Sequence, residues 1–289
     1  MDILLGSLLI QALNAIQYGL LLFLIASGLT LIFGVMGVIN IAHGSFYMMG
    51  AYFAFTITGL TGNFFVAVIL GAILSVIIGS LLEWALFKHL YKRDHLEQVL
   101  LSYGLILIFE ELRSIFVGDE VHSIDVPAWL NFSIPLGDIM SYPFYRLFMS
   151  GVCVLVAIGM YILINRTRIG SMIRAGATNS GMAEVLGVNI SMVNRLVFSL
   201  GVGLAAFAGM INAPASAVAP GMGMEVLIVS FVVVVIGGIG SVWGALFAAM
   251  VIAFADTFGS VFFPSVAGML TYIIMAMVLL WRPDGIFKR

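Results

Sequence analysis

The stretch "GVMGVINIAHGSF", residues 34–46, interrupts a long apolar run with three glycines, an asparagine and a histidine. The apolar run resumes at Phe46 and continues to about residue 60. Glycine and polar residues weaken the interior of an apolar helix. The stretch therefore predicts that a hydrophobic helix is broken here.

The composition places the chain in a membrane. Of its 289 residues, 62% are hydrophobic and only 9% are charged. A soluble domain of this length needs a more polar exterior, so most of the outer surface must face hydrocarbon. The single cysteine, Cys153, lies in an apolar segment, which excludes a disulfide framework and a thiolate metal site.

Apolar segments follow one another along the whole chain. A helix needs about 20 residues to cross the hydrocarbon core, where its backbone groups must bond within the segment. We therefore predict an all-α polytopic membrane protein with about eight or nine transmembrane helices and glycine-rich broken segments. These form one transmembrane domain over residues 1–289. The apolar segments are residues 6–33, 45–60, 64–87, 96–117, 144–164, 196–213, 225–236, 244–262 and 268–281.

Charges between these segments predict the orientation. Basic residues mark three regions as cytoplasmic by the positive-inside rule: a short loop at 88–95, a long loop at 165–195 and the C-terminal end. The loop at 118–143 carries acidic charges instead and is expected in the periplasm, which puts the N-terminus outside and the C-terminus inside. The basic residues are Lys88, Lys92, Arg93, Arg166, Arg168, Arg174, Arg195, Arg282, Lys288 and Arg289, and the acidic ones are Asp119, Glu120, Asp125 and Asp138.

Motifs for catalysis are missing from the sequence. There is no phosphate-binding loop, no nucleophile elbow and no H-E-x-x-H pair. The four histidines, His43, His89, His95 and His122, are scattered over separate segments. We therefore expect no catalytic residue, no metal site, no cofactor and no nucleic-acid partner for this chain. Membrane lipid is expected to surround it.

A second break lies near the other end of the chain. The stretch "VVVVIGGIGSVWGALFAAM", residues 232–250, passes from a β-branched run through clustered glycines into another apolar helix. The apolar piece before it, residues 225–236, would be only about 18 Å long as a helix, too short to cross alone. Its glycines are therefore expected within the membrane, where irregular backbone must be buried in protein or line a cavity.

Two explanations of the paired breaks remain open. Glycines such as Gly240 and Gly244 could simply let helices pack closely. Alternatively, paired interrupted segments can line a central transport pathway, with helix ends and neutral polar groups facing the solute. The polar residues favour the pathway, because a polar side chain at depth is costly without a use. The candidate pathway residues are Gly37, Asn40, His43, Gly44, Ser45, Gly237, Gly238, Gly240 and Ser241.

The two stretches carry a family resemblance. "GLTLIFGVMGVINIAHGSFYMMGAY", residues 28–52, and residues 232–250 resemble signatures of the LivH-type permease subunit of branched-chain amino-acid ABC importers. The resemblance implies a permease domain in the bacterial inner membrane that pairs with a LivM-type sister permease. It also implies two cytoplasmic ATPase subunits, which bind the ATP, and a periplasmic substrate-binding protein.

The long loop at 165–195 fits this resemblance. An apolar stripe of Ala175, Met182, Ala183, Val185 and Leu186 predicts a short helix that Gly187 can end in the left-handed conformation. The stretch "RAGATNSGMAEVLGV" resembles the family's coupling helix, which implies ATPase coupling by Arg174, Ala183, Glu184 and Gly187. A plain amphipathic helix at the membrane surface remains the alternative.

Charged residues also lie inside several of the apolar segments. Glu110 and Arg113, three residues apart on one helix face, are expected to form a structural ion pair rather than to contact solute. Glu225 is expected to open its helix at the outer face, where the helix dipole favours a carboxylate. Asp256 has no local partner, and Glu111 points away from Arg113.

The function expected from all of this is import of branched-chain, hydrophobic amino acids. An ABC permease explains the breaks, the cytoplasmic loop and the missing chemistry together. Permeases for urea, short amides or another small organic solute are the alternative within the same architecture. An ion-coupled secondary transporter explains the breaks alone and lacks a carboxylate cluster at mid-depth.

Overall fold

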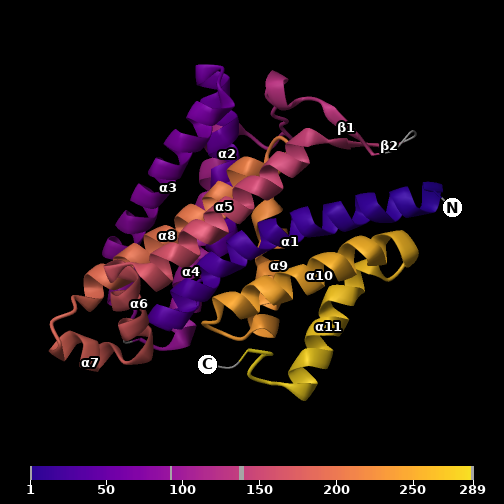
Figure 1. Cartoon of the computed structure of the whole chain (residues 1–289). Coiled ribbons are helices and arrows are strands. Elements are labelled where there is room, and N and C mark those ends of the chain that lie inside the picture. The colour runs from indigo at the N-terminus through magenta and orange to yellow at the C-terminus, as the bar shows by residue number, and fades with distance from the viewer. Residues whose placement is uncertain (1, 92, 137–139, 288–289) are drawn as a thin grey trace.

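The computed structural model describes residues 2–91, 93–136 and 140–287. Lys92, Asp138, Lys288 and Arg289, which entered the orientation argument, lie outside the described residues. The described chain forms eleven α-helices, two 3₁₀ turns and one antiparallel hairpin (Figure 1). In chain order they are α1 (Asp2–Met36), α2 (His43–Thr61), α3 (Phe64–Ala85), η1 (Phe87–His89), α4 (His95–Val117), η2 (Ala128–Leu130), β1 (Ser133–Leu136), β2 (Met140–Pro143), α5 (Phe144–Arg166), α6 (Arg168–Thr178), α7 (Ser180–Val185), α8 (Ile190–Asn212), α9 (Met222–Gly237), α10 (Val242–Phe262) and α11 (Ala267–Trp281).

Each of the nine predicted apolar segments corresponds to a helix. Side-chain caps fix where several of these helices begin, because the side chain accepts a bond from an otherwise unpaired N–H group of the first turn. Asn63 caps α3, Asn189 caps α8 and Ser241 caps α10 in this way. Gly62, in the left-handed conformation, ends α2.

The helices differ in whether they are long and apolar enough to cross a membrane. Five described helices, α1, α3, α5, α8 and α10, are long and apolar enough to cross a membrane, and α9 and α11 are apolar but shorter. In α4, Glu110, Glu111 and Arg113 interrupt the apolar stretch. The polytopic helical fold is confirmed, with fewer full-length apolar spans than the eight or nine expected.

Helix α1 forms the centre of the bundle. Its most apolar window is 78% buried, against 17% for α5. It packs against α5, α8, α9 and α10, and Figure 1 shows it running diagonally through the molecule. Helices α3 and α5 expose aliphatic side chains such as Ile77 and Leu155 on the outside. Those exposed faces are the surface expected to meet lipid.

The connections lie at opposite ends of the bundle (Figure 1). The 118–143 connection contains the hairpin, in which Ser133 pairs with Pro143 and Leu136 with Met140, and the described fold is otherwise helical. The start of α1 lies beside it, because Gly6 adjoins the Met140 side chain. Helices α6 and α7 occupy the other end, and the long connection spans 167–189 because α5 and α8 extend into the predicted loop.

Candidate functional site

The first break lies between α1 and α2. Gly37 directly follows α1 with φ +64°, a conformation that residues with a Cβ rarely adopt. Residues 37–42 are non-helical, and α2 starts at His43. The glycine therefore lets the chain leave α1 at the position that the sequence predicts.

The chain then turns back along α1. His43 Nε2 lies 3.0 Å from the carbonyl oxygen of Ile25, which is about 16 Å along the helix axis before the end of α1. The amide nitrogen of Ile39 donates to Gln98 Oε1 at 3.2 Å, which ties the break to α4. Helix α2 therefore begins inside the bundle, and the break lies at the depth of the α1 interior.

The polar side chains of this break are buried. Asn40 and His43 are fully buried, and Ser45 is 5% exposed. Asn40 Oδ1 accepts from the amide of Ala42 at 3.1 Å, whereas Asn40 Nδ2 and His43 Nδ1 have no hydrogen-bond partner within the described chain. A buried polar atom without a hydrogen-bond partner lowers the stability of the fold by about 1–3 kcal/mol. Packing alone therefore does not explain why polar residues occupy these positions.

The second break separates α9 from α10. Gly238 and Gly240 both have positive φ, at +90° and +80°. Ser241 Oγ accepts from the amide of Gly244 at 3.0 Å and caps α10. A Cβ on Gly237 would lie 2.5 Å from the carbonyl carbon of Gly244, so the two helix ends meet backbone to backbone.

The structure brings the two breaks together. A Cβ on Gly34 would lie 2.6 Å from Gly240 Cα, and a Cβ on Gly44 would collide with the carbonyl of Gly223. At Gly37 a Cβ would meet nothing within 4 Å. Gly34 and Gly44 therefore serve close packing, while the role of Gly37 is its backbone conformation.

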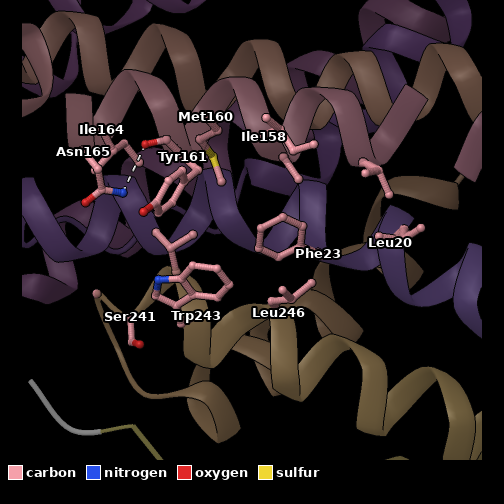
Figure 2. A pocket seen from close by; sticks show the side chains of 14 residues that line it. Leu20, Phe23, Ile158, Met160, Tyr161, Ile164, Asn165, Ser241, Trp243 and Leu246 are labelled. Atoms are coloured by element: carbon pink, nitrogen blue, oxygen red, sulfur yellow. Dashed lines mark hydrogen bonds between the residues drawn. The ribbon is translucent and has the colours of Figure 1, made fainter. Parts of the chain in front are cut away.

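A cavity of about 470 Å³ lies beside the second break, between α1, α5 and the start of α10 (Figure 2). Gly240 and Ser241 line it, together with Phe23 of α1. The rings of Tyr161 and Trp243 meet edge to face at 5.9 Å across it. The wall of this cavity is mostly apolar. Gly240 and Ser241 are the candidate pathway residues that line it.

The segment after α11 covers the second break, which the sequence did not indicate. The amide of Ile286 donates to the Ile236 carbonyl at 2.9 Å, and the amide of Phe287 to the Gly237 carbonyl at 3.3 Å. These bonds satisfy carbonyls that the end of α9 leaves unpaired. Packing of Phe287 against Phe247, at 5.7 Å between centroids, anchors the segment on α10.

The long connection forms two helices where one was predicted. Asn179 interrupts them, and its side chain caps α7 by accepting from Met182 N at 2.9 Å. Gly187 has φ +88° and follows α7, as predicted. Arg174 donates to the Ile164 carbonyl at the end of α5, so it holds α6 in place.

The apolar stripe of this connection is divided between core and surface. Ala183 is buried, whereas Met182, Val185 and Leu186 are 59%, 83% and 76% exposed. Glu184 lies among them and is exposed. The subunit therefore presents an apolar surface with one carboxylate, which we call the α7 surface, Met182, Glu184, Val185 and Leu186.

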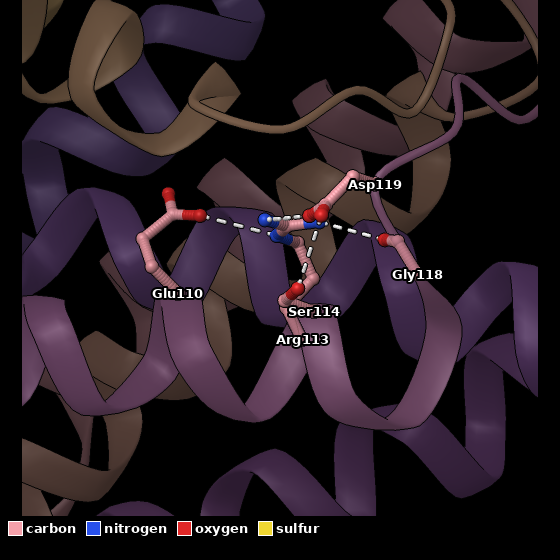
Figure 3. Close-up of polar contacts among 5 residues, drawn as sticks. All are labelled: Glu110, Arg113, Ser114, Gly118 and Asp119. Atoms are coloured by element: carbon pink, nitrogen blue, oxygen red, sulfur yellow. Dashed lines mark hydrogen bonds and ion pairs between the residues drawn. The ribbon is translucent and has the colours of Figure 1, made fainter.

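The predicted ion pair of α4 is confirmed (Figure 3). Arg113 Nε lies 3.1 Å from Glu110 Oε2, and Arg113 Nη2 lies 2.9 Å from Asp119 Oδ1. Arg113 Nη1 also donates to the Gly118 carbonyl at 2.7 Å. Hydrogen bonds from Arg113 and Ser114 hold the pKa of the Asp119 carboxyl below its usual value. This cluster fastens the end of α4, which is a structural role.

A second ion pair, formed by a buried carboxylate, was missed. Glu83 of α3 is fully buried, and its Oε2 lies 3.1 Å from Nε of Arg195 in α8. The hydroxyl of Tyr91 donates to the other carboxylate oxygen. Burial, and then the neighbouring Glu83, raise the pKa of Tyr91 above its usual value. Arg195 lies in α8 with its side chain 38% exposed, and this pair holds it against α3 rather than leaving it in a free cytoplasmic loop.

Helix α9 starts deeper than expected. Glu225 lies in its first turn, as predicted. Gly223, however, adjoins Gly44 at the start of α2, so α9 begins inside the bundle and not at its outer face. Asp256 is half-buried on α10, near enough to Tyr18 for an electrostatic interaction.

Comparisons with known proteins agree with this architecture. The model of the family described as "Branched-chain amino acid transport system / permease component" matches residues 11–280. The permease protein BraD of Pseudomonas aeruginosa, a high-affinity branched-chain amino acid transport system protein, is 29% identical over 96% of this chain and 95% of its own length. LivH of Escherichia coli, described in the same words, is 28% identical with the same coverage.

Two further similarities are more distant. The ribose import permease protein RbsC of Escherichia coli is 26% identical over 81% of this chain and 72% of its own length. Among solved structures, PsaBC from Streptococcus pneumoniae in complex with Fab gives a TM-score of 0.48 at 12% identity, over 93% of this chain and 89% of that one. The family model, which spans most of the residues, shows that this chain belongs to the permease components of branched-chain amino acid transport systems and is a non-catalytic, multi-pass membrane subunit of an ABC transporter.

Proposed function

We propose that this subunit carries branched-chain, hydrophobic amino acids across the membrane as half of a permease pair. The observation that carries the proposal is the family match over residues 11–280, together with relatives named for high-affinity branched-chain amino acid transport. The broken helices support it, because a transport pathway needs irregular backbone inside the bundle.

The complete importer is proposed to contain a LivM-type sister permease, two cytoplasmic ATPase subunits and a periplasmic substrate-binding protein. ATP is bound by the ATPases and not by this chain. The α7 surface supports this arrangement, because an exposed apolar patch rimmed by polar groups is typical of a protein contact. Asn179 and Arg174 hold α7 and α6 rigidly, so movement of an ATPase can be transmitted through Ala183, Glu184 and Gly187.

The pathway is proposed to run along the two breaks. Asn40, His43 and Ser45 supply neutral polar groups, and Gly37, Gly238, Gly240 and Ser241 shape the backbone around them. Gly44 and Gly237 let the helices that frame the pathway approach closely. The unpartnered Nδ2 of Asn40 and Nδ1 of His43 support this role, since movement of the subunits could offer them to a solute. Neutral groups suit a path that must not hold its cargo tightly.

The orientation is proposed with the N-terminus and the 118–143 loop in the periplasm. The 88–95 loop, α6, α7 and the C-terminus then face the cytoplasm. The positions of the hairpin and of α6 and α7 at opposite ends of the bundle support this (Figure 1). Arg166, Arg168 and Arg174 lie at the proposed cytoplasmic end, in agreement with the positive-inside rule.

One alternative substrate class is favoured by an observation. The similarity to a ribose import permease supports a small organic solute other than an amino acid as the alternative cargo. Urea and short amides belong to the same alternative and rest on the sequence resemblance alone. Reconstitution of the permease pair with its ATPases and binding protein tests the proposal directly. Uptake of leucine or isoleucine that requires ATP is expected. Uptake of urea instead, or uptake driven by an ion gradient without ATP, would contradict it.

A further inference from the structure

A second cavity lies where α9 begins. It has a volume of about 470 Å³ and is lined by residues of α1, α2, α5, α8 and α9 and of the connection between α8 and α9. This volume falls within the range of about 300–1,000 Å³ that is typical of small-molecule sites. Ile25, whose carbonyl contacts His43, lines the cavity, and so does Tyr47, one turn after His43 in α2. The cavity therefore adjoins the buried polar groups of the first break.

The cavity reaches the proposed periplasmic side. Ser216 and Ala217, in the connection after α8, line it and are exposed. The neighbouring Val218 forms an isolated antiparallel bridge with His122 of the 118–143 loop. A solute released on that side would thus meet this cavity before it meets His43.

A guanidinium with donors to spare lines the cavity. Arg146, in the first turn of α5, donates from Nη1 to Asn14 Oδ1 at 2.7 Å. Within the described ranges no carboxylate lies within 4.0 Å of its nitrogen atoms, whereas Arg113 binds two carboxylates. A guanidinium carries five N–H donors in a planar fork, so Arg146 can still bind a carboxylate.

A carboxylate without a cation lines the same cavity. Glu225 lies in the first turn of α9, where the positive end of the helix favours its charged form. No basic group of the described chain lies within 4.0 Å of it, although Glu83 and Glu110 each have one. Two opposite charges, neither of which has an ion-pair partner within the described chain, thus lie on the wall of one cavity.

The remaining wall divides into polar and apolar parts. Gln17, 8% exposed, and Asn212, which donates to the Tyr47 hydroxyl at 2.8 Å, supply neutral polar groups. Leu21 and Val226 belong to the apolar part. The wall offers an anion-binding group, a cation-binding group and an aliphatic surface together, which is the chemistry of an amino acid with a hydrophobic side chain.

We propose that this cavity is an amino-acid binding site on the periplasmic side of the pathway. Arg146 binds the α-carboxylate, Glu225 binds the α-ammonium group, and the aliphatic part of the wall receives the side chain. The proposal rests on the proposed function and extends it, because it adds a charged recognition site before the neutral groups at His43. Binding there selects against solutes that lack either charge.

Leucine uptake by the complete importer tests the site. We expect Arg146→Gln and Glu225→Gln each to lower uptake per ATP hydrolysed by about tenfold or more, as charge-assisted bonds to the solute are lost. Subunit assembly and the ATPase activity stimulated by the binding protein should persist, and Arg146→Lys should restore part of the uptake. The matched control is Glu111→Gln, an exposed carboxylate on α4, for which uptake should stay within about twofold.

The rate of thiol labelling at a cysteine introduced into the cavity tests solute binding there independently of transport. A Ser216→Cys variant should react with an impermeant maleimide, and leucine with the binding protein should slow the reaction. Adding Arg146→Gln should abolish that protection. Buried Cys153 is not expected to contribute.

Three outcomes would overturn the assignment in distinguishable ways. If the wild-type importer carries no leucine, the proposed function and the site both fail. If it carries leucine but the two charge-neutralising variants do so equally well, the site alone fails. If these variants lose assembly together with uptake, Arg146 and Glu225 pair with the sister subunit and not with solute.

Discussion

Gly34 of α1 and Gly240 of the second break touch backbone to backbone, since a Cβ on Gly34 would come within 2.6 Å of Gly240 Cα. Each residue belongs to one of the two interrupted stretches, which lie far apart in the sequence. The contact joins them into one structural unit at the side of the central helix. We therefore expect a substitution at one break to disturb the other.

The first prediction concerns this contact. Gly34→Ala should lower the free energy of unfolding by about 1–3 kcal/mol, because the added methyl group overpacks a backbone contact that cannot yield easily. Thermal unfolding of the detergent-purified permease pair measures the effect. Gly104→Ala in α4, where a Cβ meets nothing within 4 Å, is the control and should not destabilise the protein. Equal stability of the two variants would show that the contact is not tight.

The second prediction concerns Glu83 and Arg195. Arg195→Gln should cost about 3 kcal/mol, because it leaves a fully buried carboxylate without its cation. Arg93→Gln, which breaks an exposed pair with Glu97 at 3.8 Å, should cost at most about 1 kcal/mol. Adding Glu83→Gln to Arg195→Gln should recover part of the loss. The prediction fails if urea or thermal unfolding gives the two single variants the same stability.

The helices could be predicted from sequence because hydrophobic length is a local property. All nine apolar segments are helical, and both glycine-rich stretches interrupt helices. The pairing of Glu110 with Arg113 was also predictable, since three residues separate them on one helix. Glu83 and Arg195 were not, because they lie on different helices and only tertiary packing brings them within 3.1 Å.

The sequence could not predict how deep in the bundle α9 begins, or which segment covers the second break. Nothing local indicates that Gly223 adjoins Gly44, which places the start of α9 inside the bundle. Nothing local indicates that the amide of Ile286 pairs with the Ile236 carbonyl over the second break. Both contacts arise from how helices far apart in sequence pack, so composition and periodicity could predict the breaks but not what surrounds them.

The third prediction concerns coupling to the ATPases. Glu184→Ala and Gly187→Pro should each abolish uptake and ATPase stimulation while the subunit still inserts, because α7 would no longer fit its partner. At Gly187 the strain has a specific cause, since φ of +88° is inaccessible to proline. ATP hydrolysis and leucine uptake in proteoliposomes are the measurements.

A control separates coupling from general damage. Leu60→Ser changes a residue that is 81% exposed at the end of α2, away from α7, and should leave ATPase stimulation unchanged. Survival of both transport and stimulation in Gly187→Pro would remove the coupling assignment and favour a plain surface helix.

The fourth prediction concerns orientation. Single cysteines introduced at Ser123 and Asn131, both exposed, should react with an impermeant thiol reagent added to intact cells. A cysteine at Thr178, equally exposed on α6, should react only after the membrane is opened. The native Cys153 is buried and should not react in either case. The reverse pattern would invert the proposed topology.

The last prediction concerns the first break itself. His43→Leu removes the ring nitrogen that contacts the Ile25 carbonyl at 3.0 Å and the unpartnered Nδ1 on the other side of the ring. Uptake should fall by about tenfold or more, the equivalent of a lost polar contact of about 1–3 kcal/mol. Gly37→Val should have a similar effect for a different reason, since φ of +64° is unfavourable for a β-branched residue although space for a Cβ is present.

Assembly of the two variants decides what the break is for. If His43→Leu and Gly37→Val insert and assemble with the sister subunit but fail to transport, the polar groups and the backbone turn serve the passage of solute. His43→Gln, which can still donate to the Ile25 carbonyl, should then retain more uptake than His43→Leu. If both assembled variants transport normally, the break at residues 37–42 only allows α1 and α2 to pack, and the buried polar atoms have no part in the pathway.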